Sequence, residues 1–409
     1  MIQTPYNLIC ISHLPWSTMW KRDQSLIDRL SRSPQIHRVI FVNPAVWLTD
    51  LIFDYRNQVS SSHQKLYKFS WKAAFPRKVG DKVTAVTPVQ FIPLARSRPN
   101  LARLQMKFHK WELNRLLQGR DYILFLNDYN YNPERRKLAE ALLEKAKFVV
   151  FDWSDDFIEF SEDPVVRGKI NEVCEYYVRT SDVVLTVNES LTQRAVKLNT
   201  HSYTISNGAD IERLSIKDNA DREVPEALRS LSKPLIGYVG WITPTRIDSE
   251  LLSHLARTRP DWTLVLMGPV YEKFSRTFES HKNIVFLPPV DYQVLSRYLN
   301  CFDVCIIPHR VNDHTRGNDP LKVYTYLAAG KPVVSTPISG LDSFKNVVYI
   351  SKDQADFTRL IEQAMKEDGI QLRKERFKKA EENSWTSRAD DIWKILEDHL
   401  TQPKRSRPE

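Results

Sequence analysis

Short apolar runs alternate with longer stretches of helical pattern along most of the chain. The runs are rich in Val, Ile, Leu and Phe, and a helix-length segment separates most of them from the next. They are Leu8–Ile11, Val39–Val42, Tyr122–Leu126, Phe148–Phe151, Val183–Val187, Tyr203–Ile205, Leu235–Val239, Thr263–Met267, Ile284–Leu287, Val304–Ile307 and Pro332–Ser335. Strands of a parallel sheet, which are buried on both faces, have this near-continuous apolar character. The pattern therefore predicts an α/β protein built on parallel strands.

The apolar runs fall into two series. A polar stretch, Ile211–Lys233, separates the series and is typical of a linker between domains. A chain of 409 residues is also longer than one hydrophobic core usually serves. We therefore predict two domains, residues 1–215 and residues 216–386.

The composition is that of a folded protein. Hydrophobic residues make up 42% of the chain and charged residues 27%, which excludes an intrinsically disordered class. No apolar run approaches the ~18 residues that a membrane-spanning helix needs. The first residues lack the basic flank and apolar stretch of a secretory signal, so we expect a cytoplasmic protein. We expect the four cysteines to be reduced thiols, with a metal or redox role as the alternative.

A net charge of +9 calls for a partner of opposite sign. Nucleic acid, an anionic membrane surface or a phosphorylated substrate would each satisfy it. The basic residues spread across the chain and no nucleic-acid motif accompanies them, so we expect no nucleic-acid partner.

The stretch from Asn318 to Thr336 carries the most chemical information. Pro320 is a favoured residue in the first turn of a helix, and Gly330 ends that helix before the next strand. The N-terminus of a helix offers backbone N–H groups and positive dipole character, which suit a diphosphate. Lys322 lies in the first turn, where a cation is unfavourable unless an anion is bound. A solvated surface lysine is the alternative.

This stretch resembles the donor-site segment of the family 4 (group 1) glycosyltransferases, whose pattern is Pro-x-Lys-x-x-Glu-Tyr-x-Ala-x-Gly-Lys-Pro-Val. The matching residues are Pro320, Lys322, Tyr326, Ala328, Gly330, Lys331, Pro332 and Val333. The resemblance implies a GT-B fold of two facing Rossmann-like domains, with the nucleotide sugar held by the C-terminal one. It also implies that Lys322 neutralises the diphosphate, and that Leu321 and the nearby backbone contact the donor. Thr325 replaces the family's Glu, which holds the ribose hydroxyls, and a single hydroxyl can only replace part of that grip.

A second block begins with Leu235–Trp241, a strand ending at Gly240, where a ligand can approach the backbone. Together with the strand that ends at Gly268, it resembles glycosyltransferases of teichuronic acid synthesis. By that resemblance Gly240, Trp241 and Gly268 border the donor and Arg246 is a phosphate ligand, whereas spacing alone would leave Arg246 on the surface. Arg316 is a further candidate for the leaving diphosphate.

Metal and cofactor dependence are not expected. The chain has no Asp-x-Asp triplet and its histidines are scattered, so we expect no metal site. In this interpretation Lys322, Arg246 and the helix dipole stabilise the leaving diphosphate. The only small molecule required would be the nucleotide sugar, as a substrate.

Two loops of the N-terminal half are candidates for acceptor binding. The loop after the first strand holds His13, Trp16 and Arg22, and it resembles a Trp-x-x-x-x-Gln-Arg-Pro-Gln stretch of the same family. Trp16 could stack on a sugar ring and Arg22 could meet a phosphate, or the tryptophan could pack beneath the loop. Asp128 follows another strand and is a similar candidate.

Asp155 and Asp156 follow the run Phe148–Phe151. Adjacent carboxylates repel each other, which can raise one pKa and suit it to proton transfer. Relatives carry a similar Asp-x-x-Asp-Asp, so these residues could bind or deprotonate an acceptor hydroxyl. Capping of a helix is the alternative.

The resemblance implies an enzyme that moves a sugar onto a glycan or lipid-linked acceptor, with retention of the anomeric configuration. It also implies that a last helix, residues 387–400, returns to pack on the N-terminal domain. Thr325 keeps open the alternative of an inactive GT-B-like protein that only binds nucleotide or glycan.

The segment Arg96–Arg120 interleaves basic and apolar residues, with Glu112 as its single acid. A basic amphipathic helix of this kind fits the surface of an anionic bilayer. An ordinary structural helix with a solvated basic face is the alternative.

Overall fold

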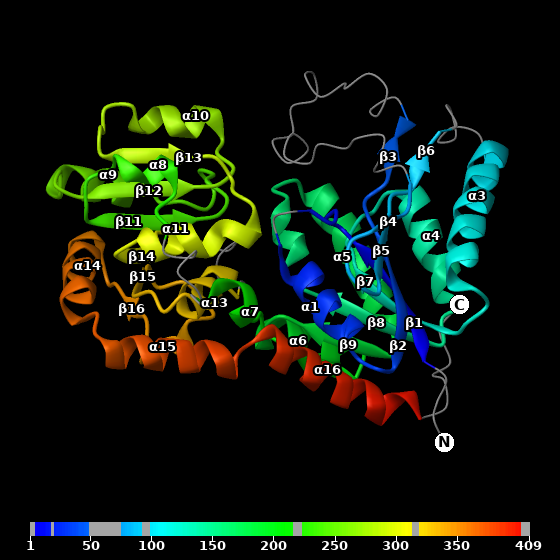
Figure 1. Cartoon of the computed structure of the whole chain (residues 1–409). Helices are drawn as coiled ribbons and strands as arrows, with labels where there is room; N and C mark the ends of the chain where they lie inside the picture. The colour runs from blue at the N-terminus through cyan, green and yellow to red at the C-terminus, as the bar shows by residue number, and fades with distance from the viewer. Residues whose placement is uncertain are drawn as a thin grey trace. The chain divides into compact units, whose positions relative to one another are not determined.

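The computed structural model describes residues 5–17, 20–48, 75–91, 99–215, 223–312 and 319–401 (Figure 1). The chain forms two compact units. Unit 1 comprises Met1–Ile205 and Ala389–Glu409, and unit 2 comprises Ser206–Arg388. Each unit is built on a mostly parallel sheet with helices, so the predicted α/β class is confirmed.

The main sheet of unit 1 has eight strands in the order β10-β9-β8-β7-β1-β2-β5-β4. All neighbouring strands run parallel except β4 and β5. The strands are β1 (Tyr6–Ser12), β2 (Ile36–Val42), β4 (Arg77–Lys78), β5 (Val83–Val86), β7 (Tyr122–Asn127), β8 (Phe148–Trp153), β9 (Val183–Thr186) and β10 (Ser202–Thr204). Two short strands, β3 (Val46–Trp47) and β6 (Val89–Gln90), pair separately. Carboxyl ends of β1, β7 and β8 meet at one edge, because these three neighbours are parallel.

Helices of unit 1 cover the faces of this sheet. They are α1 (Arg22–Ser31), α3 (Pro99–Leu117), α4 (Pro133–Leu143), α5 (Pro164–Thr180), α6 (Glu189–Val196) and the part of α16 (Trp385–Leu400) that begins at Ala389. A short 3₁₀ helix, η4 (Phe157–Phe160), precedes α5. The start of α5 follows local rules, since Asp163 accepts a bond from the Val165 N–H and Pro164 occupies the first turn.

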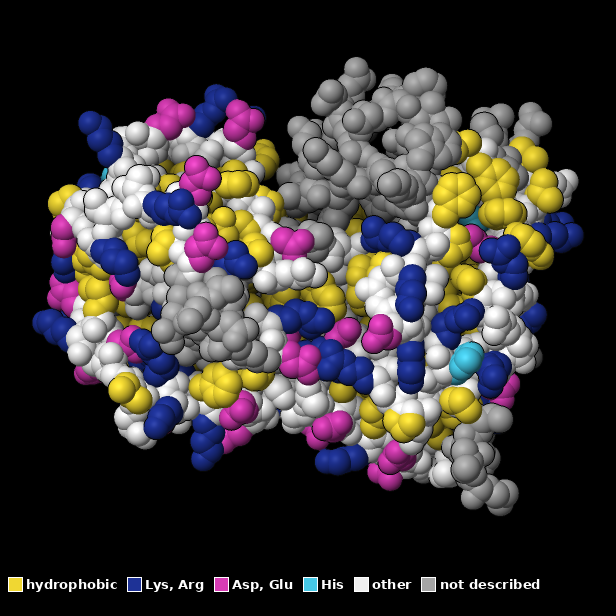
Figure 2. Space-filling view, in the orientation of Figure 1, with side chains coloured by type: hydrophobic (Ala, Val, Ile, Leu, Met, Phe, Trp, Pro, Cys, Tyr) yellow, Lys and Arg dark blue, Asp and Glu magenta, His cyan; other side chains and the backbone are white. Residues whose placement is uncertain are grey.

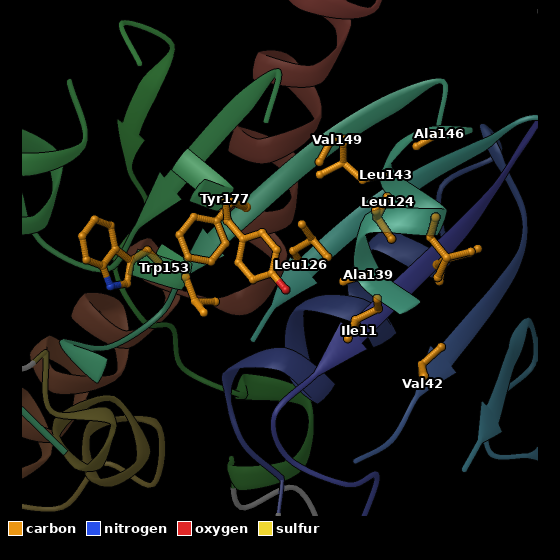
Figure 3. Close-up of a cluster of buried hydrophobic side chains, with 14 of the residues drawn as sticks. Ile11, Val42, Leu124, Leu126, Ala139, Leu143, Ala146, Val149, Trp153 and Tyr177 are labelled. Atoms are coloured by element: carbon orange, nitrogen blue, oxygen red, sulfur yellow. The ribbon is translucent and has the colours of Figure 1, made fainter. Parts of the chain in front are cut away.

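Alternation along the strands decides which residues meet these helices. Ile11 of β1 and Leu124 of β7 pack with Ala139 and Leu143 of α4 and with Tyr177 of α5 (Figure 3). Leu8 and Cys10 are equally buried but belong to the opposite face. Both faces of the sheet are therefore covered, which explains why its strands read as continuous apolar runs.

Unit 2 contains a six-stranded, fully parallel sheet in the order β13-β12-β11-β14-β15-β16. Its strands are β11 (Leu235–Val239), β12 (Thr263–Met267), β13 (Ile284–Leu287), β14 (Val304–Ile307), β15 (Val333–Ser335) and β16 (Tyr349–Ile350). Its helices are α7 (Ile211–Leu214), α8 (Glu226–Arg229), α9 (Ser249–Thr258), α10 (Glu272–Ser275), α11 (Leu295–Cys301), α13 (Leu321–Ala328), α14 (Gln354–Glu367) and α15 (Ile370–Glu382), with 3₁₀ helices η6 (Arg276–Phe278), η7 (Tyr292–Val294) and η8 (Asp342–Phe344). Gly237 in the middle of β11 admits the ring of Phe302, since a Cβ atom there would lie 2.1 Å from it.

The predicted strands of unit 2 from β11 to β14 coincide with those in the structure. Five strands, β3, β4, β5, β6 and β16, lie outside the predicted runs. All except β5 have only two residues, and the apolar run of β5 is interrupted by Thr84. Residues of the predicted linker contribute to unit 2, as Leu214 and Leu228 are buried in its core. Within the described residues, no helix is both long and apolar enough to cross a membrane.

Candidate functional site

In unit 2, the carboxyl ends of β11 and β12 meet at two glycines. Gly240 has φ of +144° and Gly268 has φ of +143°, a region that favours glycine. A Cβ atom on Gly268 would lie 2.2 Å from the carbonyl oxygen of Gly240. The Gly240 N–H donates to the Met267 carbonyl at 2.9 Å, which joins the two strand ends. The two glycines, taken from separate motifs of the sequence, are thus neighbours.

The side chain of Lys322 reaches from α13 to the end of β11. A Cβ atom on Gly240 would lie 2.7 Å from Lys322 Nζ, so the ammonium group rests against this glycine. Nζ also lies 5.1 Å from the centre of the Tyr238 ring, within the range of a cation–π interaction. The structure therefore brings together two residues that were predicted as donor ligands from different segments.

Tyr238 supports this lysine from a fully buried position. Its hydroxyl donates to the carbonyl oxygen of Trp241 at 2.9 Å and lies 3.3 Å from Nε2 of His309. Burial raises the pKa of Tyr238, and the positive charge of Arg246 acts in the opposite direction. The phenol is therefore neutral, and the charge of Arg246 lies in the same part of unit 2 as that of Lys322.

Helix α13 begins one residue later than predicted. Pro320 is the N-cap, with φ of −74° and ψ of 101°, and Leu321 is the first helical residue. Pro320 makes no side-chain capping bond, and the Val323 N–H donates to the Pro320 carbonyl at 3.0 Å. The N-terminus of α13, with Lys322 in its first turn, is a centre of positive potential.

The loop before α13 is held by a pair that the sequence analysis did not single out. Asn207 donates from its backbone N–H to the carboxylate of Asp319, and its Nδ2 donates to the Asp319 carbonyl at 2.8 Å. The hydroxyl of Tyr324 also donates to this carboxylate, at 2.9 Å. Because Asn207 and Asp319 are distant in sequence, only the fold reveals how the helix start is positioned.

Other residues of the donor motif have internal partners. The Thr325 hydroxyl donates to the Leu321 carbonyl at 3.1 Å, a local bond of the kind common for Thr in helices. Lys331 is buried, and its Nζ donates to the carbonyl oxygens of Asn300 and Phe302 at 2.8 and 2.7 Å. Burial lowers the pKa of Lys331. Lys331 therefore stabilises the unit internally, and a ribose contact of Thr325 stays a prediction.

The remaining donor candidates are partly placed. Arg246 and Trp241 are half-buried, and the Arg246 carbonyl accepts a bond from the Arg310 N–H at 2.8 Å. Arg316 lies outside the described residues.

In unit 1, a buried polar network lies at the carboxyl ends of β1, β7 and β8. Asp152 is fully buried and accepts bonds from Nη2 of Arg22 at 2.8 Å and from Nδ2 of Asn127 at 2.7 Å. Nε of Arg22 also donates to the same carboxylate. The guanidinium of Arg22 is thus engaged by a buried carboxylate, and a ligand phosphate at Arg22 stays a prediction.

His13 is oriented by this network. Its Nδ1 lies 2.7 Å from Oδ1 and 3.1 Å from the backbone oxygen of Asn127. Both atoms are acceptors, because the Asn127 amide nitrogen faces Asp152, so Nδ1 must carry the proton. With the proton on Nδ1, Nε2 is the ring nitrogen that can offer a lone pair to a ligand. The ring also packs against Tyr129 and Phe157, at centroid distances of 5.2 and 5.3 Å.

Asp128 and Trp16 have structural partners in the same unit. The carboxylate of Asp128, fully buried, forms an ion pair with Arg135, whose guanidinium also donates to the carbonyl oxygens of Ser12 and Asn43. The indole of Trp16 packs edge-on against Phe41 at 5.0 Å, and its backbone N–H donates to Oδ1 of Asn43 at 2.8 Å. These contacts agree with the packing alternative for Trp16.

The two adjacent carboxylates after β8 differ in their surroundings. Asp156 pairs with Arg194 at 3.0 Å, and the guanidinium of Arg194 lies 4.9 Å from the centre of the Trp153 ring. Oδ1 of Asp155 accepts the Asp156 N–H at 2.9 Å. Asp156 is the N-cap residue of η4, but its side chain does not cap it. The proposed proton transfer by either residue stays a prediction.

No cluster of three or more His, Cys, Asp or Glu side chains suited to a metal ion occurs among the described residues. Sequence reasoning assigned no role to Asp152, Arg135 or Tyr238, and it noted Asn127 only as the neighbour of Asp128. Asn127 and Asp152 each end or nearly end a buried apolar run, and a polar residue at that position was the available signal.

Comparison with known proteins relates part of the chain to a known family. Residues 233–367 match the family described as Glycosyl transferases group 1. The chain is also 26% identical over 181 residues to the putative teichuronic acid biosynthesis glycosyltransferase TuaH of Bacillus subtilis strain 168. This match covers 42% of our chain and 45% of the relative, so it spans less than half of that protein.

Solved structures resemble the chain over nearly its whole length. Sucrose-phosphate synthase from Thermosynechococcus elongatus has a TM-score of 0.68 at 13% identity, covering 96% of our chain and 98% of its own. HepE from Anabaena, solved with UDP and glucose, has a TM-score of 0.63 at 12% identity, covering 96% and 100%. At such identities the likeness concerns the fold. The chain has the GT-B fold, as the resemblance of its motifs implied, and its residues 233–367 are similar to the group 1 glycosyltransferases.

Proposed function

We propose that the chain is a glycosyltransferase that moves a sugar from a nucleotide-sugar donor to a glycan or lipid-linked acceptor, in the synthesis of a cell-surface polysaccharide or glycolipid. One observation carries the proposal. Lys322, in the first turn of α13, places its ammonium group against Gly240 at the end of β11, and both residues lie within the segment that matches the group 1 family. The name of the TuaH relative supports the polysaccharide context.

The donor would bind to unit 2 through its diphosphate. Lys322, Arg246 and the N–H groups at the start of α13 supply positive potential where negative charge develops on the leaving diphosphate. Gly240 and Gly268 leave the strand ends without side chains, so a ligand can approach the backbone. Because HepE was solved with UDP and glucose, UDP-sugars are the first donors to test.

The acceptor would bind to unit 1. The lone pair of His13 Nε2 can accept a hydrogen bond from an acceptor hydroxyl, since Nδ1 is occupied by Asn127. Asp155 is half-buried, and its carbonyl accepts the N–H of Phe157, whose ring packs against His13. Trp16, Arg22, Asp128 and Asp156 already have the structural partners described above. Each could contact an acceptor only in addition to those partners or by giving one of them up.

The proposed reaction is retaining and independent of metal. The bond from the anomeric carbon to the phosphate oxygen breaks, the bond to the acceptor oxygen forms on the same face, and the acceptor proton passes to the leaving phosphate. Lys322 and Arg246 would take the charge-neutralising part that a cation plays elsewhere. Transfer in the presence of EDTA and the anomeric coupling of the product by NMR test these two points.

A panel of UDP-, GDP- and dTDP-sugars tests the proposal directly, first by thermal shift and then by donor hydrolysis or transfer. We expect one donor class to stabilise the protein and to be turned over. Tight nucleotide binding without turnover of any donor would instead favour a GT-B-like binding protein. The replacement of the family's Glu by Thr325, whose hydroxyl bonds to the Leu321 carbonyl, is the observation that favours that second function.

A further inference from the structure

Helix α3 has a buried and an exposed side of different character. Gln105, His109, Leu113 and Leu117 face inward, and the last two belong to the core of unit 1. These residues pack α3 against the unit.

Large apolar side chains project from the exposed side. Leu104 is 57% exposed, Phe108 42% and Trp111 57%. Their spacings of four and three residues place them on one side of the helix. The ring of Phe108 lies 5.9 Å from that of Trp111 and 5.1 Å from that of Phe91, so they form one aromatic surface. Figure 2 shows hydrophobic side chains gathered over α3, with Lys and Arg side chains at the border.

Cations accompany this apolar stripe. Arg103, Lys107 and Arg115 are exposed and, at 100° per residue, project from the same side of the helix. The guanidinium of Arg115 lies 5.5 Å from the centre of the Trp111 ring. We call the set Arg103, Leu104, Lys107, Phe108, Trp111 and Arg115 the outer face of α3. Glu112 is half-buried and lies beside it, and burial raises the pKa of its carboxyl.

We propose that the outer face of α3 docks on the surface of an anionic lipid bilayer, with the helix axis parallel to the membrane. Leu104, Phe108 and Trp111 would enter the interface between headgroups and acyl chains, and the three cations would meet lipid phosphates. The three cations of the outer face are complementary in charge to anionic lipid headgroups, which favours a bilayer over other partners. A second copy of the chain would bring three cations against three cations, which is repulsive. The inference goes beyond sugar transfer and does not depend on it.

Cosedimentation of the full-length protein with phosphatidylcholine vesicles, with and without phosphatidylglycerol, tests the proposal. We expect binding that requires phosphatidylglycerol and weakens with salt. The apolar variant Leu104→Ser/Phe108→Ser/Trp111→Ser should lower the partition coefficient at least ~10-fold, because it removes the side chains that enter the interface. The charge variant Arg103→Gln/Lys107→Gln/Arg115→Gln should also lower it at least ~10-fold, since each cation near an anionic surface contributes about fivefold.

Matched controls lie elsewhere in unit 1. Val165→Ser/Val196→Ser removes two exposed apolar side chains, and Lys145→Gln/Lys147→Gln/Lys197→Gln removes three exposed cations. Both controls should bind vesicles as the wild type does. If the aromatic variant fails to fold by circular dichroism, the charge variant alone decides.

Two results would overturn the proposal. The first is a wild-type protein that does not bind the anionic vesicles, and the second is undiminished binding by the folded outer-face variants. If vesicle binding is absent and analytical ultracentrifugation shows a wild-type dimer that the aromatic variant abolishes, the outer face is assigned to self-association instead.

Discussion

Gly240 and Lys322 lie so close together that a Cβ atom at the end of β11 would displace the end of the lysine side chain. A Cβ atom on Gly240 would lie 2.6 Å from Cε and 2.7 Å from Nζ of Lys322. The φ of +144° at Gly240 imposes glycine independently. The residue is therefore required both for the backbone and for the position of the lysine.

Gly240→Ala should disturb both roles. We expect the free energy of unfolding to fall by about 1–3 kcal/mol because of the strained φ, and donor affinity to fall because Lys322 is displaced. Gly119→Ala is the matched control, since Gly119 has φ of +71° but no atom within 4 Å of the added Cβ position. The control should lose stability and keep donor affinity. Unchanged nucleotide affinity in a folded Gly240→Ala protein would contradict the proposed donor site.

Lys322→Ala should remove a cation that acts on the leaving diphosphate. We expect transfer, measured as kcat/KM for the donor, to lose about 2–4 kcal/mol of transition-state stabilisation. Lys282→Ala changes an exposed lysine of the same unit and should have no such effect. Near-normal transfer in Lys322→Ala would remove this residue from the site.

Asn127→Leu should uncouple acceptor chemistry from donor chemistry. The change removes one of the hydrogen bonds to the buried Asp152 carboxylate and the Oδ1 acceptor of His13 Nδ1, so the free energy of unfolding should fall by about 1–3 kcal/mol. Acceptor-dependent transfer should fall more than donor hydrolysis, because the His13 ring loses the shorter of its two contacts with Asn127 and is less firmly oriented. Asn199→Leu, which removes buried bonds to the Val178 and Ser181 carbonyls, is the structural control. An equal ratio of transfer to hydrolysis in both variants would argue against the role of His13.

His109 should make unit 1 sensitive to acid. Burial lowers the pKa of His109 from 6.5 to about 4, so between these values the unfolded chain takes up a proton that the folded chain does not. The free energy of unfolding therefore falls as the pH drops through this window, by up to ~3 kcal/mol. In His109→Leu this part of the pH dependence should disappear. Denaturant titrations at several pH values measure it, and parallel curves for the two proteins would refute the assignment.

The donor motif could be recognised from sequence because its chemistry is local. Pro320 marks the start of one helix, Lys322 its charge and Gly330 its end. All three lie within eleven consecutive residues, so the sequence of this short segment is enough to recognise the helix. The partners of Lys322 could not be recognised in this way. Tyr238 and Gly240 lie on another strand, and nothing in their own segment indicates that a lysine packs on them.

The candidates in the first unit show the opposite case. Arg22 and Asp128 were predicted as ligand-binding residues because each follows or approaches a strand end. In the structure each forms a buried ion pair, with Asp152 and Arg135 respectively. A charged residue at a strand end is compatible with either role, and its partner comes from a distant segment.

The sequence by itself determined the α/β class, most strands, the GT-B resemblance and the donor helix, because periodicity, capping and motif spacing are properties of neighbouring residues. Tertiary structure alone decided which polar groups are engaged. It placed Lys322 against Gly240, oriented His13 through Asn127 and Asp152, and left Phe108 and Trp111 exposed on α3. The physical reason is that hydrogen-bond satisfaction and burial depend on contacts between segments far apart in the chain.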